Sequence, residues 1–483
     1  MFSLNIKPQY IPARYFSFCV LLTVLLVTLS IRSLQGELFI TDAQYMVAAG
    51  RWIIANGHLP TTDPLSIHSE LTYICQQYPI CILVAVLYDT FGEMSVRLFF
   101  ALLDMVAVLF IWYQTFPKAG NRILHCAVSC VFGAVIVYSL RSTPRALDIL
   151  CLAVSWELME KYIESRDIRF LFGFPFLGIF IANLHGALWP CAIMLPLAAL
   201  LDSKLDSNAR AALAVTILLT IASAMLNPYG LDVLSLPFKT IGTSDVATVA
   251  VPELKPMFSI VPVEAVILIV ISVVPVIFHA KCLGFKKTVF SFETMMISGL
   301  LFLSLMTWRN ELLLLGILTI VYSTWCWKIE PKCKASSKML SRIVLFSISV
   351  VALEFGAVLF YSTLSATDQK SISLERAFQA MREDGAVSGT AVLTDIDPGN
   401  GFKPYLDTRI EVFNGQNGQK NVLAEAGKAL SSGSLSAICD DYGMDYAVLN
   451  YGINDVGIQD LKESGFKPVY SDNLTVCLKR STV

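Results

Sequence analysis

The stretch YFSFCVLLTVLLVTLSI, residues Tyr15–Ile31, decides the fold class of this chain. It carries no charged residue and approaches the roughly 20 apolar residues that a helix needs to cross a bilayer. Similar runs recur at Val261–Phe278 and Ile343–Leu359, and the chain is 55% hydrophobic and only 15% charged. Soluble proteins have about 25% charged residues. A buried soluble core does not explain runs that recur along so much of the chain, so the sequence predicts a polytopic membrane protein.

Hydropathy separates about eleven helices that could cross the membrane. The apolar piece Tyr78–Tyr88 is too short to cross, and we expect it to form a helix at the membrane interface. Lys7 and Arg14 precede the first apolar run, which we interpret as a signal-anchor that is retained. The expected spans lie near residues 15–32, 95–114, 123–140, 146–161, 168–184, 187–201, 209–226, 261–279, 289–307, 311–327 and 343–363.

The distribution of Lys and Arg predicts the orientation. With a cytoplasmic N-terminus, seventeen of these residues before Asp368 fall on the inner side and eight on the outer side, as the positive-inside rule requires. We therefore expect an integral, multi-pass protein of the inner (cytoplasmic) membrane with a first outer loop at residues 33–94. The net charge of −2 gives no basic excess, so nucleic acid is not an expected partner.

The composition changes after Ala366. The runs AVLTDIDPG, MDYAVLNYG and GFKPVYSDNLTVCLKR predict strands, and helical stretches are expected near Ser373–Glu383, Val422–Ser431 and Asp455–Glu463. The sequence thus predicts a mainly α protein, with a transmembrane helical bundle over residues 1–366 and a small extracytoplasmic α/β domain over residues 367–483. Cys439 and Cys477 fall in that domain, and the sequence is compatible with either a disulfide between them or two free thiols.

Polar residues that the orientation does not explain gather in turns on the outer side. The inner loops, in contrast, are short and basic. This one-sidedness predicts a functional site at the outer interface. The outer turns are LRSTPRALD (Leu140–Asp148), ANLHG (Ala182–Gly186), LNPYGLD (Leu226–Asp232) and TWRNE (Thr307–Glu311).

The first outer loop contains two candidate carboxylates. Asp42 begins a helical stretch in which Tyr45, Ala49 and Trp52 repeat at helical spacing, which predicts an apolar face. A carboxylate is favourable at that helix N-terminus. Asp63 precedes a proline and marks a turn. Both residues are candidates for a site, and both also have a purely structural interpretation, as a helix cap and as a turn residue.

Several outer residues are candidates for substrate binding. Arg141 and Arg145 flank Pro144 in one turn, and a guanidinium suits phosphate oxygens through paired hydrogen bonds. Arg145 could instead pair with Asp148, which lies three residues further on. A lone histidine such as His185 is more often structural than catalytic. The further candidates in the outer turns are Tyr229 and Arg309.

The order of these features resembles the GT-C superfamily of polytopic glycosyltransferases, which use polyprenyl-phosphate sugars. The likeness is closest to a largely uncharacterised bacterial branch that carries an Asp, then a Gly, then a G-x-x-P-x-x-D-P-x-S string. These are here Asp42, Gly50 and Gly57–Ser66. The C-terminal PYLDTRIEVFNG (Pro404–Gly415) is similar as well. The chain departs from the branch at Gln76–Pro79, where the branch has Trp.

The resemblance implies hexosyl or pentosyl transfer from a polyprenyl-phosphate donor to a glycan, lipid or protein acceptor of the cell envelope. The acidic residue of the family falls on Asp42, where it acts as base or helps to hold a divalent ion. Because many members have paired acidic residues where this chain has Thr41-Asp42, a requirement for Mg²⁺ or Mn²⁺ stays open. The remaining roles would be phosphate binding by Arg141 and Arg145, and orientation of sugar or acceptor by Asp63 and His185.

Two other classes of function remain alternatives. A transporter or flippase of a lipid-linked glycan needs polar residues along a path through the bilayer, and the scattered candidates are Asp104, Glu293 and Glu354. A non-catalytic subunit of envelope assembly would have no pocket around Asp42.

Overall fold

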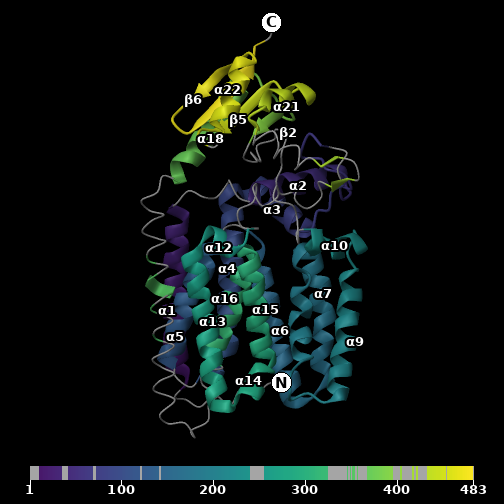
Figure 1. Ribbon diagram of the computed structural model, residues 1–483, viewed down its shortest axis with the longest axis vertical. Helices are drawn as coiled ribbons and strands as arrows, with labels where there is room; N and C mark the ends of the chain where they lie inside the picture. Colours follow the sequence, from purple (N-terminus) through teal and green to yellow (C-terminus); the bar gives the residue numbers. More distant parts are fainter. Residues whose placement is uncertain are drawn as a thin grey trace. The chain divides into compact units, whose positions relative to one another are not determined.

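The structure is a computed structural model, and contacts divide its chain into two compact units (Figure 1). The helical unit comprises Met1–Leu34, Leu98–Gly230 and Lys255–Tyr361, and the second unit comprises Gln35–Arg97, Leu231–Leu254 and Ser362–Val483. The residues that the structure describes are 10–34, 42–68, 72–119, 122–140, 143–239, 255–324, 345, 349, 351–353, 356, 367–394, 403–404, 416–417, 420–421, 432–452 and 454–481.

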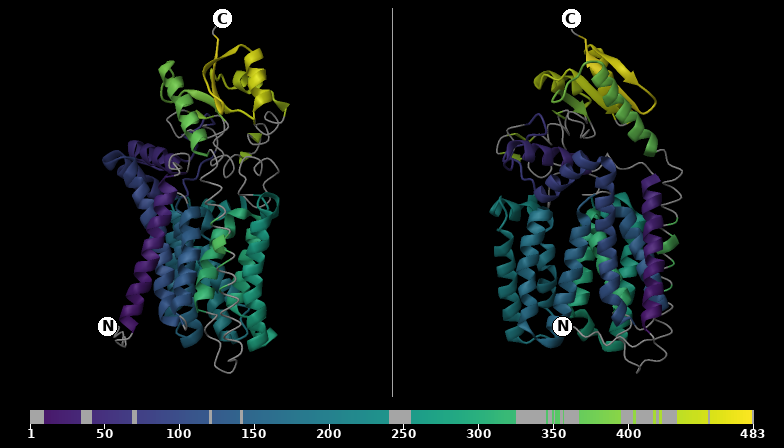
Figure 2. Two further views of the ribbon diagram at one scale, coloured as in Figure 1. Left: turned by 90° about the vertical axis from the view of Figure 1, so that its left-hand side faces the viewer. Right: turned by 180° about the vertical axis from the view of Figure 1, so that it is seen from behind.

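The helical unit is a bundle whose long helices run in roughly the same direction, as all three views show (Figures 1 and 2). The first ten expected spans each coincide with helical residues, and the eleventh, near 343–363, lies largely outside the described residues. The elements are α1 (Tyr10–Leu34), α4 (Glu93–Thr115), η1 (Phe116–Lys118), α5 (Arg122–Leu140), α6 (Arg145–Ser165), η2 (Ile168–Phe172), α7 (Gly173–Leu184), η3 (Gly186–Leu188), α8 (Cys191–Ala199), α9 (Ser207–Ala224), α12 (Met257–Ile260), α13 (Pro262–Leu283), α14 (Phe285–Val289), α15 (Phe292–Met306), η5 (Trp308–Asn310) and α16 (Glu311–Thr324).

Within the part of the chain that the structure describes, four helices are long and apolar enough to cross a membrane: Arg14–Arg32, Glu93–Lys118, Arg122–Leu140 and Ser207–Ala224. The other apolar helices are shorter, such as Ile168–Leu184. The chain is an integral membrane protein by these helices, and the count of eleven crossings stays a prediction.

Small residues let helices of the bundle approach closely. A Cβ built on Gly178 of α7 would lie 2.7 Å from the Ser223 hydroxyl and 2.8 Å from the Thr220 carbonyl oxygen of α9. Only glycine fits at that point, because a backbone carbonyl cannot move aside as a side chain can. This contact fixes α7 against α9 and so positions the turn that follows α7.

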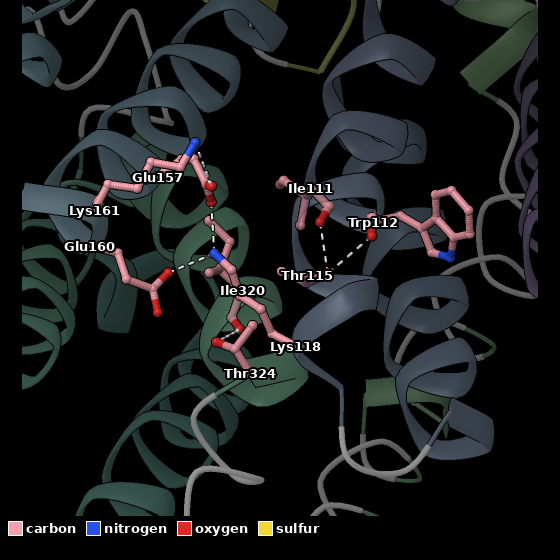
Figure 3. A network of polar contacts seen from close by, with 9 residues as sticks. All are labelled: Ile111, Trp112, Thr115, Lys118, Glu157, Glu160, Lys161, Ile320 and Thr324. Atoms are coloured by element: carbon pink, nitrogen blue, oxygen red, sulfur yellow. Dashed lines mark hydrogen bonds and ion pairs between the residues drawn. The ribbon is translucent and has the colours of Figure 1, made fainter. Parts of the chain in front are cut away.

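A network of charged and hydroxyl side chains ties the end of α4 to the C-terminal half of α6 (Figure 3). Lys118 donates to Glu157 and Glu160, each at 2.7 Å, and Lys161 lies 3.2 Å from Glu157. Asp148 near the start of the same helix is nine residues from Glu157 in the sequence, or about 13 Å along the axis. The two ends of α6 therefore carry separate polar groups, and Lys118 balances the acidic residues at this end.

The second unit begins with two packed helices, α2 (Asp42–Asn56) and α3 (Tyr78–Phe91). On the expected apolar face of α2, Ala49 is buried, while Tyr45 and Trp52 are half-buried. The buried residues of α2 form a neighbouring stripe. The closest contact between α2 and α3 is at a glycine of this stripe. The stripe consists of Ala43, Met46, Val47, Gly50 and Ile53.

Gly50 is the point of closest approach between α2 and α3. A Cβ at this position would lie 1.9 Å from the carbonyl oxygen of Cys81 and 2.8 Å from the Cβ of Ala85. Across the same pair of helices, Arg51 donates to Asp89 through Nε at 2.9 Å. The hydrogen bond from Arg51 lowers the pKa of Asp89.

The C-terminal part of the second unit is a five-stranded mixed sheet with the strand order β2-β1-β5-β7-β6. Strand β1 pairs in parallel with β2 and β5, while β7 pairs antiparallel with β5 and β6. The three predicted strand regions are confirmed. The strands are β1 (Ala391–Thr394), β2 (Lys403–Pro404), β5 (Tyr446–Asn450), β6 (Phe466–Ser471) and β7 (Thr475–Arg480). Outside this sheet, β3 (Gln416–Asn417) pairs with β4 (Lys420–Asn421), and α10 spans Leu231–Lys239.

Helices cover both faces of the sheet. Helix α18 (Thr367–Glu383) packs on one face, and α21 (Leu435–Asp441) and α22 (Asp455–Glu463) pack on the other. Two of the expected helices are confirmed, α21 was not predicted, and Val422–Ser431 lies outside the described residues. Figure 2 shows α18 in green against the yellow strands.

The sheet also settles the relation between its two cysteines. Cys439 belongs to the apolar cluster on the α21–α22 face, and Cys477 belongs to the cluster on the α18 face. Because successive residues of a strand point to opposite faces, the two buried thiols are separated by the sheet. Both are free, and burial raises the pKa of each thiol to about 12.

Candidate functional site

A buried carboxylate and a buried imidazole are in direct contact within the helical unit. Asp148 lies in the first turn of α6, and His185 directly follows α7. The His185 Nδ1 atom lies 2.9 and 2.8 Å from the two Asp148 carboxylate oxygens. The two side chains are 0% and 3% exposed. An ionised carboxylate only accepts hydrogen bonds, so an ionised Asp148 requires Nδ1 of the ring to be the donor in this contact.

Two arginines surround this pair. Arg145 is the first residue of α6, and Arg309 lies in the short η5 turn between α15 and α16. Both are half-buried, and both guanidinium groups interact electrostatically with the Asp148 carboxylate. The structure thus brings together residues from three of the predicted outer turns. We call Arg145, Asp148, His185 and Arg309 the Asp148 cluster.

The turns NLHG and NPYG are joined by their asparagines. The Asn183 amide donates to the carbonyl oxygen of Leu226 at 3.1 Å, and the Asn227 amide donates to the carbonyl oxygen of Ala182 at 2.7 Å. The Asn227 side chain also accepts from the backbone amide of Tyr229 at 2.9 Å. These bonds place half-buried Tyr229 in a turn that is tied directly to the segment carrying His185.

The candidate residues of the first loop belong to the second unit. Asp42 is the first residue of α2, as the helical pattern predicted. Asp63 is 1% exposed, and its carboxylate accepts from the Leu65 and Ser66 amides at 2.9 and 3.3 Å and from the Ser66 hydroxyl at 2.6 Å. Asp63 therefore holds a tight turn.

The turn at Asp63 positions a short segment on the C-terminal sheet domain. Ile67 packs against the apolar cluster on the α21–α22 face, and the His68 ring lies edge-on to Tyr442 with centroids 5.2 Å apart. Both residues are part of the second unit. The first loop is thus anchored on the domain that follows it by about 300 residues in the sequence, because Asp63 shapes the turn that presents Ile67.

Two of the candidate residues lie outside the part of the chain that the structure describes. Arg141 lies outside the described residues, as does the alternative transport candidate Glu354. Among the described residues, no group of three or more His, Cys, Asp or Glu side chains is arranged to hold a metal ion.

The Asp148 cluster suits an anion. The two guanidinium groups offer fixed forks of N–H donors, and the imidazole has its Nδ1 hydrogen directed at Asp148, which leaves Nε2 as its second hydrogen-bonding atom. A carboxylate on one nitrogen of a histidine sets the tautomer and orientation of the ring. Asp148 therefore orders the cluster, and the cationic groups supply its binding capacity.

The sequence indicated three members of the cluster but missed the central one. Asp148 was considered only as a neighbour of Arg145, whereas its hydrogen-bond partner lies 37 residues away. The available signal was a carboxylate at the beginning of an apolar helix, where an unpaired charge is costly.

One of three comparisons with known proteins finds a protein of similar fold. No protein-family model matches the chain, and no curated protein matches it. Among solved structures, the chain is similar to the crystal structure of ArnT from Cupriavidus metallidurans bound to undecaprenyl phosphate. The TM-score is 0.52 at 13% identity, over 96% of this chain and 97% of that chain. The chain therefore shares the fold of that protein over nearly its whole length.

Proposed function

We propose that the protein is a membrane glycosyltransferase that moves a sugar from a polyprenyl-phosphate donor to an acceptor of the cell envelope at the outer face of the membrane. The observation that carries this proposal is the Asp148 cluster, in which two arginines and an ordered histidine occur together in a GT-C fold. The ArnT crystal structure, which has this fold, holds undecaprenyl phosphate, a lipid of the proposed donor class.

The cluster would act on the donor. Arg145 and Arg309, with Arg141 from the same turn as Arg145, would hold the phosphate through charge-assisted hydrogen bonds. The phosphate gains negative charge as the bond to the sugar breaks, and fixed cationic donors stabilise that charge more in the transition state than in the bound donor. His185 would orient the sugar or the phosphate through Nε2, with Asp148 holding the ring in place.

Asp42 would act on the acceptor. As general base it would take the proton of the acceptor hydroxyl, which then attacks the anomeric carbon. A single displacement of this kind inverts the anomeric configuration. Asp63 has a structural part in this account, because its carboxylate is already engaged in the Asp63–Ser66 turn.

The transporter alternative is weaker. Its candidate Asp104 is fully buried but bound to Arg32, whose Nη1 donates to Asp104 at 2.9 Å and to the Val137 carbonyl at 2.7 Å. This pair ties α1 to α4, which gives Asp104 a structural role that does not require transport.

Mass spectrometry of envelope glycans tests the proposed function and identifies the sugar and the acceptor. A deletion strain should lack one glycan modification that the parent strain carries. The wild-type gene should restore the modification, and an Asp42→Asn variant produced at the same level should not. Unchanged glycans in the deletion strain, under conditions in which the protein is present in the parent, would contradict the proposal.

A further inference from the structure

Two cysteines of the first loop lie side by side in the second unit. Cys75 is in the turn that leads into α3, and Cys81 is in the first turn of that helix. Their sulfur atoms are 3.7 Å apart. The residues are 1% and 0% exposed.

The backbone holds the two thiols in this position. The amide of Tyr78 donates to the carbonyl oxygen of Cys75 at 3.1 Å, and the amide of Cys81 donates to the carbonyl oxygen of Gln77 at 3.0 Å. Pro79 in the first turn of α3 restricts the backbone further. The chain therefore folds back on itself, and Cys75 lies over the helix that contains Cys81.

The surroundings favour ionisation of one of the thiols. The hydrogen bond with Cys81 lowers the pKa of Cys75, and the Tyr73 hydroxyl and the Gln77 amide lower it further, against the opposing effect of burial. The thiolate is the nucleophile in thiol–disulfide exchange. Cys75 is thus the thiol of the pair whose ionisation the folded arrangement favours.

We propose that Cys75 and Cys81 form a disulfide bond in the mature protein. The first loop is predicted to lie outside the cytoplasmic membrane, where the compartment is oxidising. A disulfide requires a sulfur–sulfur distance of about 2.05 Å, so bond formation draws together two sulfur atoms that already lie 3.7 Å apart.

The oxidant is a disulfide-carrying thiol oxidoreductase of that compartment. The Cys75 thiolate attacks its disulfide, forms a mixed disulfide and releases one thiolate of the oxidoreductase. The Cys81 thiolate then attacks the Cys75 sulfur and releases the second. The two cysteines lose two electrons and two protons in total, and the oxidoreductase leaves as a dithiol.

The bond would stabilise the part of the loop on which α2 lies. Gly50 of α2 packs directly on the Cys81 backbone, so a covalent link at Cys81 restricts the surface that α2 contacts. The Tyr45 hydroxyl of α2 is also hydrogen-bonded to the hydroxyl of Tyr73, two residues before Cys75. Helix α2 begins at Asp42, so the link supports the helix that carries the proposed base.

Peptide mass spectrometry on the full-length protein tests the disulfide. Cells are quenched in acid, thiols are blocked with N-ethylmaleimide under denaturing conditions without reductant, and the protein is digested with trypsin. Both cysteines fall in one tryptic peptide, Trp52–Arg97. We expect this peptide without adducts and lighter by two hydrogen atoms, and with two adducts when reductant precedes blocking.

Internal controls make the result decisive. Cys439 and Cys477, on opposite faces of the sheet, should each carry an adduct without reductant. Cys75→Ser should leave Cys81 as an alkylated thiol. Two adducts on the wild-type peptide before reduction, or a link from either cysteine to Cys439 or Cys477, would overturn the proposal. In a second measurement, reductant should lower the Tm of the wild type and leave that of the Cys75→Ser/Cys81→Ser variant unchanged; an unchanged wild-type Tm would show that the bond does not stabilise the loop.

Discussion

Asp148 and His185 form a buried pair whose partners depend on each other. The two side chains are almost inaccessible to water and share two short contacts. Removing the partner of a buried charged group typically costs about 3–5 kcal/mol, because that charge is left uncompensated. The pair is therefore a stability element as well as the organiser of the cluster.

A double-mutant cycle should reveal this dependence. His185→Leu leaves the Asp148 carboxylate buried without its hydrogen-bond donor, and we expect a loss of about 3 kcal/mol in the free energy of unfolding. Adding Asp148→Asn removes the stranded charge, so the double variant should be more stable than the sum of the single losses by about 1–3 kcal/mol. Denaturant unfolding in detergent micelles measures the free energy of unfolding of the wild type, the two single variants and the double variant. Strictly additive losses would contradict an interaction between Asp148 and His185.

The arginines of the cluster should determine affinity for the donor phosphate. A hydrogen bond to a charged group is worth about 1.5–3 kcal/mol, so Arg145→Gln and Arg309→Gln should each weaken undecaprenyl-phosphate binding about tenfold or more. Arg169→Gln is the control, since Arg169 is an exposed residue of η2 that binds Asp167. Native mass spectrometry of the purified protein with added lipid measures the affinities. Equal lipid binding by the wild type and the three variants would show that the arginines of the cluster do not bind the phosphate.

The packing of α2 on α3 positions the helix that begins at Asp42. Gly50→Ala introduces a methyl group where the Cys81 carbonyl oxygen already lies. Overpacking costs about 1–3 kcal/mol, so this variant should show faster protease cleavage between the two helices. Gly299→Ala in α15 is the control, because no neighbouring atom of the described residues lies within 4 Å of its added Cβ. Indistinguishable cleavage in the two variants would contradict the close contact at Gly50.

The β6–β7 hairpin of the C-terminal domain should be sensitive to acid. Burial tends to raise the pKa of Asp472, but hydrogen bonds from the Ser373 and Tyr470 hydroxyls and from the Leu474 and Thr475 amides lower it well below the ordinary value. A carboxyl whose pKa is lowered by folding stabilises the folded state above its unfolded pKa of about 3.9 and loses that contribution as the pH falls.

Hydrogen–deuterium exchange of the hairpin follows this titration in the full-length protein, after correction for the intrinsic pH dependence of exchange. Protection of β6 and β7 in the wild type should decrease between neutral pH and pH values below about 4. Asp472→Asn should be less protected at neutral pH and should lose the acid-dependent step. If the variant showed an acid-dependent step of the same size, groups other than Asp472 would cause that step.

The sequence predicted helices and strands well where composition and period are sufficient. Apolar runs marked the helices of the bundle, and β-like runs bounded by turn residues marked β5 and β7. The short α21 was missed because its seven residues give too little pattern. Contacts between distant segments were not predictable either. The contact of His185 with Asp148, and that of Ile67 with the C-terminal sheet, depend on tertiary packing that no local pattern reports.

Each compact unit of the chain provides candidate residues to which we assign a separate role. The helical unit provides Arg145, Asp148, His185 and Arg309, which we assign to the donor phosphate. The second unit provides Asp42, which we assign to the acceptor, on a helix supported by α3. This division of labour requires that a loss of Asp42 abolish transfer and leave donor binding intact, whereas a loss of the arginines weakens binding itself.

Transfer by the purified protein tests this account most directly. The protein is reconstituted in lipid nanodiscs with isotope-labelled polyprenyl-phosphate sugars, and envelope material from the deletion strain supplies the acceptor. The account predicts that the wild type transfers label to the acceptor and releases polyprenyl phosphate. Asp42→Asn should bind the lipid equally well and transfer at least about a hundredfold more slowly, since general-base catalysis contributes about 10²–10⁴-fold. Transfer by Asp42→Asn at the wild-type rate, or no transfer by the wild type with any polyprenyl-phosphate sugar, would contradict the account.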